Sequence, residues 1–108
     1  MADTLHSATG VLGTSATDII DAVPSSTTET SIGILLANVN SSSQDVTVDL
    51  SLTKSGGTLR HLLNNVTLPA GATIELNTKI TCETGDVLQG LCSSASSAEF
   101  TCTFLRQT

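Results

Sequence analysis

Apolar and polar residues alternate most regularly between residues 45 and 53. Val46, Val48, Leu50 and Leu52 occupy every second position, and the residues between them are polar. A repeat of two is that of a strand with one face in the core and one in water, because successive strand side chains point to opposite faces. The segment therefore predicts a half-buried antiparallel strand.

A second segment, residues 31–40, is apolar on both of its faces. Ile32, Ile34 and Leu36 share one face, while Leu35 and Ala37 share the other. A strand of this kind is either central in its sheet or covered on its outer side by another chain.

The remaining strands are expected to be short and separated by turns. Pro24, the Gly56-Gly57 pair, the Pro69-Ala70-Gly71 run, Gly85 and the serine-rich residues 93–97 are the turn signals. Between them, strands are predicted over residues 18–23, over 59–63 with a continuation at 66–68, over 74–76 with the pattern extended by Ile80 and Cys82, and over 87–91 and 100–104. No window has the spacing of an amphipathic helix, although residues 17–23 also admit one. The pattern predicts an all-β fold, an antiparallel β-sandwich of seven or eight strands that is either Ig-like or jelly-roll-like, over residues 17–108.

The first sixteen residues are polar and small and have no strand or helix period. We expect residues 1–16 to form an extended N-terminal arm that becomes ordered against a partner.

Composition narrows the function classes. With 108 residues the chain is one domain, and its net charge of -6 argues against nucleic acids and anionic membrane surfaces as partners. The chain opens without a basic, apolar leader and has no apolar stretch long enough to span a membrane, so we expect assembly in a cytosol.

Chemistry-bearing patterns are scarce. His6 lies in the predicted arm and His61 on a short strand, neither near an acid in sequence, and no nucleophile elbow, calcium loop or phosphate-binding loop is present. We therefore expect no enzyme activity, no catalytic residue, no metal and no cofactor.

Three cysteines recur at intervals of ten residues, at Cys82, Cys92 and Cys102. This spacing is not that of a zinc site, and an odd number cannot pair completely within one chain. Burial as reduced, small apolar side chains is one interpretation. A Cys92–Cys102 disulfide across a serine-rich hairpin is a second, and a cross-subunit or metal role stays open.

Several of these elements in order resemble a family of small β-sandwich virion proteins of tailed bacteriophages, which includes capsid decoration (cement) proteins. The resemblance lies in Ile34-Leu35-Leu36-Ala37-Asn38-Val39, Val46-Thr47-Val48-Asp49-Leu50, Leu68-Pro69-Ala70-Gly71 and Gly85-Asp86-Val87-Leu88. It covers residues 10–106, and the cysteines are not part of it.

The resemblance implies function by surface contact. The chain would be a decoration protein that stabilises the head lattice, with the major capsid protein or other virion proteins as partners, located in the virion and assembled in the host cytoplasm. It would be a homo-oligomer, with a trimer favoured. The candidate interface residues are Leu5, Val11, Leu12, Ile32, Ile34, Leu35 and Leu36. The first alternative is a neck, tail or fibre component of the virion. The second alternative is a carbohydrate- or receptor-binding module, which is disfavoured because the chain has no Trp or Tyr to stack on a sugar.

Overall fold

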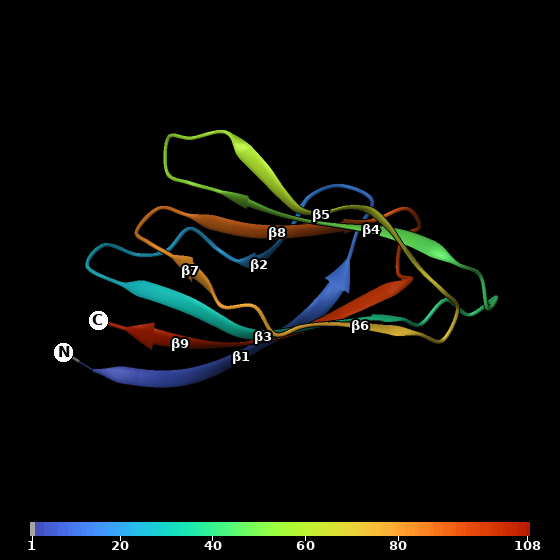
Figure 1. Cartoon of the computed structure of the whole chain (residues 1–108), viewed down its shortest axis with the longest axis horizontal. Helices are drawn as coiled ribbons and strands as arrows, with labels where there is room; N and C mark the ends of the chain where they lie inside the picture. The colour runs from blue at the N-terminus through green and yellow to red at the C-terminus, as the bar shows by residue number, and fades with distance from the viewer. Residues whose placement is uncertain (1) are drawn as a thin grey trace.

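Two antiparallel sheets packed face to face make up the protein (Figure 1). The computed structural model describes residues 2–108, and these form nine strands and no helix. The strands are β1 (Asp3–Leu12), β2 (Thr17–Ile20), β3 (Thr28–Asn38), β4 (Val46–Thr53), β5 (Leu59–Leu68), β6 (Thr73–Leu76), β7 (Ile80–Cys82), β8 (Val87–Cys92) and β9 (Ala98–Gln107). The predicted all-β sandwich is confirmed.

The order of the strands is that of a jelly roll. One sheet runs β1-β9-β3-β6, with β7 also paired to β3, and the other runs β2-β8-β4-β5. Strands β6 and β7 both pair with β3, one along each half of it, so they act as one interrupted strand. Counted in this way, the eight strands form two four-stranded sheets in the strand order of a double-sheet jelly roll. The described residues form nine strands where seven or eight were predicted, because the pattern predicted from residue 74 to residue 82 is divided into β6 and β7 and because β1 was not predicted.

Alternating side chains of both sheets build the core. In β4, Val46, Val48 and Leu50 point inward and are buried, as their spacing predicts. β3 is central in its sheet, between β9 on one side and β6 and β7 on the other, which is one of the two positions expected for it. Ile34 and Leu36 are fully buried, while Leu35 lies on the outer face with 41% of its surface exposed.

Turn chemistry follows the sequence at the predicted positions. Gly56 (φ 70°) and Gly71 (φ 73°) adopt the left-handed backbone that glycine tolerates without cost. The Gly57 N–H donates to the carbonyl of Lys54 and closes the turn after β4. The two short strands predicted around residues 59–68 are one strand, β5, with an irregular register near Asn65 (φ 51°).

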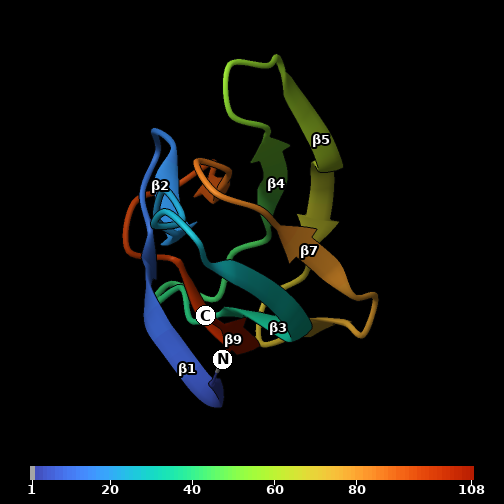
Figure 2. The same cartoon turned by 90° about the vertical axis from the view of Figure 1, so that its left-hand side faces the viewer.

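The N-terminal segment differs from its prediction. Residues 3–12 are a strand, β1, that pairs antiparallel with β9 over ten residues, so the prediction that this region lacks strand structure is wrong. Residue 1 of the predicted arm lies outside the described residues. Periodicity could not find β1 because Asp3 to Ser7 are exposed on both faces, and Leu12 alone in this strand is fully buried. Viewed from the end, β1 lies on one flank of the molecule, opposite β5 and β7 (Figure 2).

Close backbone approach helps to explain how β1 docks. At Gly10 an added Cβ would lie 2.7 Å from the ring of Phe100, so the absence of a side chain leaves room for this ring. The carboxyl end of the strand then carries Leu12 into the core between the sheets.

Candidate functional site

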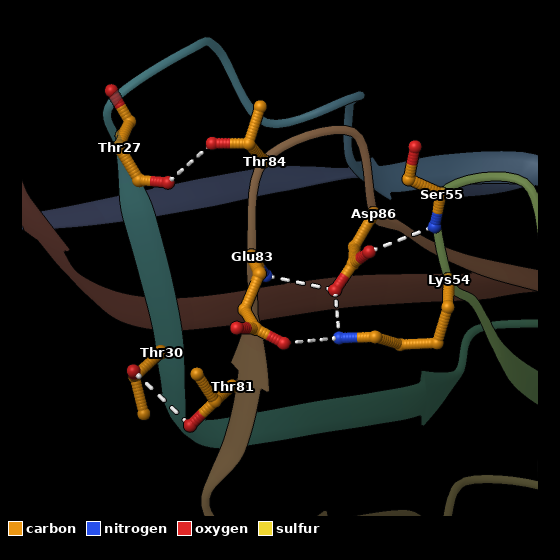
Figure 3. Close-up of polar contacts among 8 residues, drawn as sticks. All are labelled: Thr27, Thr30, Lys54, Ser55, Thr81, Glu83, Thr84 and Asp86. Carbon is orange, nitrogen blue, oxygen red and sulfur yellow. Dashed lines mark hydrogen bonds and ion pairs between the residues drawn. The ribbon is translucent and has the colours of Figure 1, made fainter.

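The most organised polar cluster of the molecule surrounds Asp86, at the end of the sandwich where β4 and β7 end and β8 begins (Figure 3). The carboxylate of Asp86 accepts hydrogen bonds from the backbone N–H of Ser55 (2.9 Å) and of Glu83 (2.8 Å). Lys54 Nζ contacts the same carboxylate and lies 2.8 Å from Oε1 of Glu83. Asp86 thus ties the β4–β5 turn to the β7–β8 turn.

Burial and partners act in opposite directions on the Asp86 carboxyl. Burial by itself raises its pKa, but the Lys54 ammonium and the two backbone N–H groups outweigh burial and hold the pKa below its ordinary value. The hydrogen bonds to Asp86 and then to Glu83 raise the pKa of Lys54. Both groups are therefore charged at neutral pH, which fits an ion pair and not a proton-transfer pair.

A hollow of about 450 Å³ opens beside this cluster, lined by polar side chains of the neighbouring turns. Thr84 donates from its hydroxyl to the carbonyls of Pro24 (3.1 Å) and Thr27 (3.3 Å) on the opposite wall. Among the described residues no buried side-chain nitrogen or oxygen lacks a hydrogen-bond partner. The cluster is satisfied internally, so its geometry is that of a structural clasp.

A second hollow, of about 440 Å³, lies between β1 and β9 on one side and β2 on the other. On its wall Arg106 Nε donates to Oε2 of the buried Glu29 at 2.6 Å. At its mouth the pKa of Asp21 is raised, by its hydrogen bond to Asp18 first, then by burial and by the charges of Asp18 and Glu29. Within residues 2–108, no three His, Cys, Asp or Glu side chains lie close enough to hold one metal ion.

Neither histidine lines these two hollows, although His6 contacts Phe104, which lines the second. His6 is exposed on β1, hydrogen-bonded to Thr4 (2.9 Å) and stacked on Phe104 with ring centroids 5.5 Å apart. His61 is exposed on β5 and pairs in register with Ser51 of β4.

All three cysteines are buried and carry free thiols. The hairpin expected to bring Cys92 opposite Cys102 does not form, because β8 and β9 belong to different sheets and the serine-rich residues 93–97 carry the chain from one sheet to the other. Burial, and then the negative charges of Asp86 and Glu29, raise the pKa of Cys82 to about 11. Burial likewise raises the pKa of Cys102, whose thiol also lies 3.6 Å from the hydroxyl of Ser31.

We expect the native protein to resist thiol alkylation at pH 8. All three thiols are buried, and the raised pKa values of Cys82 and Cys102 further reduce their reactive thiolate, so labelling should be roughly 100-fold slower than in urea, where all three cysteines react. Mass spectrometry of the labelled chain measures this. The variant Ser42→Cys, with a thiol on an exposed turn, is the control and should take up one label in the native state. Rapid labelling of Cys82, Cys92 or Cys102 in the wild type would contradict the burial.

The predicted interface residues divide into two groups. Leu12, Ile34 and Leu36 have no exposed surface and belong to the core of the chain itself, so their prediction as contact residues is wrong. The alternation in β1 and β3 that places these three inward turns Leu5, Val11 and Leu35 outward, with 69%, 46% and 41% of their surfaces exposed. Ile32, 39% exposed, is the extra residue where the register of β3 and β9 shifts.

We refer to the exposed side of the β1-β9-β3 strands as the outer face. By register Leu5 lies beside Leu105 and Thr30, Thr9 beside Thr101 and Leu35, and Val11 beside Glu99 and Ala37. It is a surface of Thr and aliphatic side chains with few charges.

No family model and no curated protein matches the sequence. Several solved chains share the fold, including the following two. A chain from Bacillus endospore appendages, described as disulfide-linked pili, superposes with a TM-score of 0.61 at 16% sequence identity, covering 99% of this chain and 87% of that one. A chain from the acid-stable capsid of the Helicobacter pylori bacteriophage KHP30 superposes with a TM-score of 0.51 at 14% identity, covering 98% of this chain and 87% of that one. At these identities the matches show a common fold.

Sequence reasoning did not find the polar residues that connect distant strands. Asn38, buried at the end of β3, donates from Nδ2 to the carbonyls of Gln44 (2.9 Å) and Leu68 (3.0 Å). Lys54 and Arg106 were likewise not singled out. Asn38 stands in an Asn-Val-Asn sequence, which would be read as a local turn or cap. The ion-pair partners of Lys54 and Arg106 are 29 or more residues away in the sequence, so no short sequence pattern indicates these pairs.

Proposed function

We propose that this chain is a structural subunit of a multi-copy particle, and specifically a virion protein that decorates the head lattice. The observation that carries the proposal is that the jelly roll accounts for nearly the whole chain and for 87% of both the capsid chain and the pilus chain it superposes on. A subunit that is all sandwich acts through its surfaces, as the resemblance to phage virion proteins implies.

The cysteines favour the virion over a pilus. The appendage proteins are described as disulfide-linked, and cross-linking between subunits needs accessible thiols. Here all three thiols are buried in the core, so association of this chain would be non-covalent. Many weak contacts repeated over a lattice suffice for stable decoration through avidity.

The outer face is the proposed contact with the particle. It presents Leu5, Val11 and Leu35 among threonines, and such exposed aliphatic residues lose unfavourable contact with water on docking. We also propose that copies of this chain associate with one another. In this proposal the clasp at Asp86 has a structural role and not a catalytic one, because it holds the β4–β5 turn against the β7–β8 turn.

The variant Leu35→Lys tests the outer face. A lysine there can pair with Glu75, its neighbour on β6, so folding should be retained while binding to particles that lack the protein falls by roughly tenfold or more. Co-sedimentation with the particles measures the binding. Leu62→Lys is the matched control, because Leu62 is 43% exposed but lies on the other sheet. Equal loss of binding in both variants would contradict docking through the outer face.

Copy number separates the candidate locations. Quantitative mass spectrometry of purified particles should find hundreds of copies for a lattice decoration protein and about a dozen for a neck or tail component. The second result would place the chain in the neck, tail or fibres. Absence from particles would refute the virion proposal.

A further inference from the structure

Strand β1 is an edge of the larger sheet, and its backbone shows which groups face outward. The N–H of Thr108 donates to the carbonyl of Ala2 at 3.0 Å, and the register of β1 and β9 places these two residues opposite each other. In an antiparallel pair, residues that exchange hydrogen bonds alternate with residues that do not. The even-numbered residues of β1 therefore bond to β9, and Leu5, Ser7 and Thr9 turn their N–H and C=O groups to the free edge.

This edge lacks the features that keep exposed strands from pairing. Natural edges are blunted by short length, bulges, proline or charge. Along the ten residues paired with β9, β1 has no shift of register, and its sequence contains neither Pro nor Lys. Asp3, at one end, is its sole charged residue.

The other edges of the described sheets are protected. β2 has four residues, an irregular register and the charge of Asp18. β5 has two register shifts and carries Arg60. The edge beside β3 is divided between β6 and β7. β1 therefore finds no matching edge on a second copy other than β1 itself.

The geometry points to antiparallel pairing of β1 with β1 of a second copy, which joins the two larger sheets into one continuous sheet. A partner of the same kind must approach a chain of net charge -6, and β1 offers it a nearly neutral path. Antiparallel pairing places the two Asp3 carboxylates at opposite ends of the new ladder. A two-fold contact of this kind closes on itself and gives a dimer. This inference rests on the proposed function. Pairing of β1 would join the outer faces of two copies into one extended surface for contact with the particle.

Size-exclusion chromatography with light scattering tests the pairing across a concentration series. The wild type should convert from monomer to dimer. Ser7→Pro removes an N–H that faces the free edge and none that faces β9, and proline is accepted at such edge positions, so this variant should remain monomeric with its sandwich intact by circular dichroism. Ser7→Thr keeps the N–H and is the matched control, expected to dimerise like the wild type.

Hydrogen exchange monitored by NMR gives a reading specific to the edge. In the dimer the amides of Leu5, Ser7 and Thr9 should be protected roughly tenfold or more over the monomer, while those of Thr4, His6 and Ala8 are already protected in both states. A monomeric wild type, a trimer, or a Ser7→Pro variant that still dimerises would overturn the pairing. Particle binding and copy number are measured independently, so a monomer that still decorates particles refutes this pairing alone, and a dimer absent from particles refutes the proposed function alone.

Discussion

Replacing Asp86 by alanine is expected to lower the free energy of unfolding by about 3 kcal/mol, because it removes a buried acceptor from two backbone N–H groups. Only 2% of the Asp86 side chain is exposed, and its two carboxylate oxygens each accept one of these hydrogen bonds, Oδ1 from Ser55 and Oδ2 from Glu83. Urea unfolding followed by far-ultraviolet circular dichroism measures the loss; intrinsic fluorescence is unsuitable because the chain has no Trp or Tyr.

Asp45→Ala is the matched control for this prediction. Asp45 also accepts a backbone N–H from a turn, that of Ala70 at 3.0 Å, but it is exposed, so water replaces it at a cost of about 1 kcal/mol or less. Equal losses in the two variants would contradict the role of burial.

The contribution of Asp86 to the free energy of unfolding should also decrease at acidic pH. Its pKa is lower in the folded protein than its ordinary value of 3.8, so the folded state binds this proton less readily than the unfolded chain. The stabilisation is complete above the ordinary value and is lost as the pH falls through the folded pKa. The difference in stability between wild type and Asp86→Ala should therefore stay constant near neutrality and shrink once the pH drops below 3.8. A difference that does not change on acidification would contradict the ionised clasp.

Replacing Arg106 by methionine should be comparably destabilising. Glu29 is buried, with 4% of its side chain exposed, and Arg106 supplies the cation beside it. Loss of that cation leaves a buried carboxylate without its counter-charge, which costs about 3 kcal/mol or more. The same urea titration by circular dichroism measures the change.

A double variant distinguishes an ion-pair effect from lost packing. In Glu29→Met with Arg106→Met, two apolar side chains of similar volume replace both charges, and such replacements are often neutral. We expect the double variant to regain stability to within about 1 kcal/mol of the wild type. A double variant as unstable as Arg106→Met alone would show that packing by Arg106, and not the pairing of charges, is what matters.

The alternation of residues 45–53 predicted β4 correctly, because side-chain period depends only on neighbouring residues. The two apolar faces of residues 31–40 predicted a strand that is either central or covered by another chain, and the fold shows that it is central. The turns at Gly56 and Gly71 were predictable for a related reason: the residues themselves permit the backbone that the turn requires. The sandwich class follows from these local features together.

The pairing of strands that are far apart in the sequence could not be predicted from side-chain period or turn residues. β1 has no core-facing alternation over its first half and forms a strand because β9 offers it a ladder of hydrogen bonds. The same limit applied to the cysteines, since the serine-rich turn reads as a hairpin but the chain crosses there to the other sheet.

The amino-acid sequence by itself determined that this protein is built from aliphatic, alternating strands joined by Gly, Pro and Ser turns. Only the tertiary structure decided which edge stays open, which leucines face solvent, and which charges pair across the molecule. Period and turn propensity are properties of a few consecutive residues, whereas sheet order and ion pairing join residues as far apart as Glu29 and Arg106, and these are chosen by the packing of the whole chain.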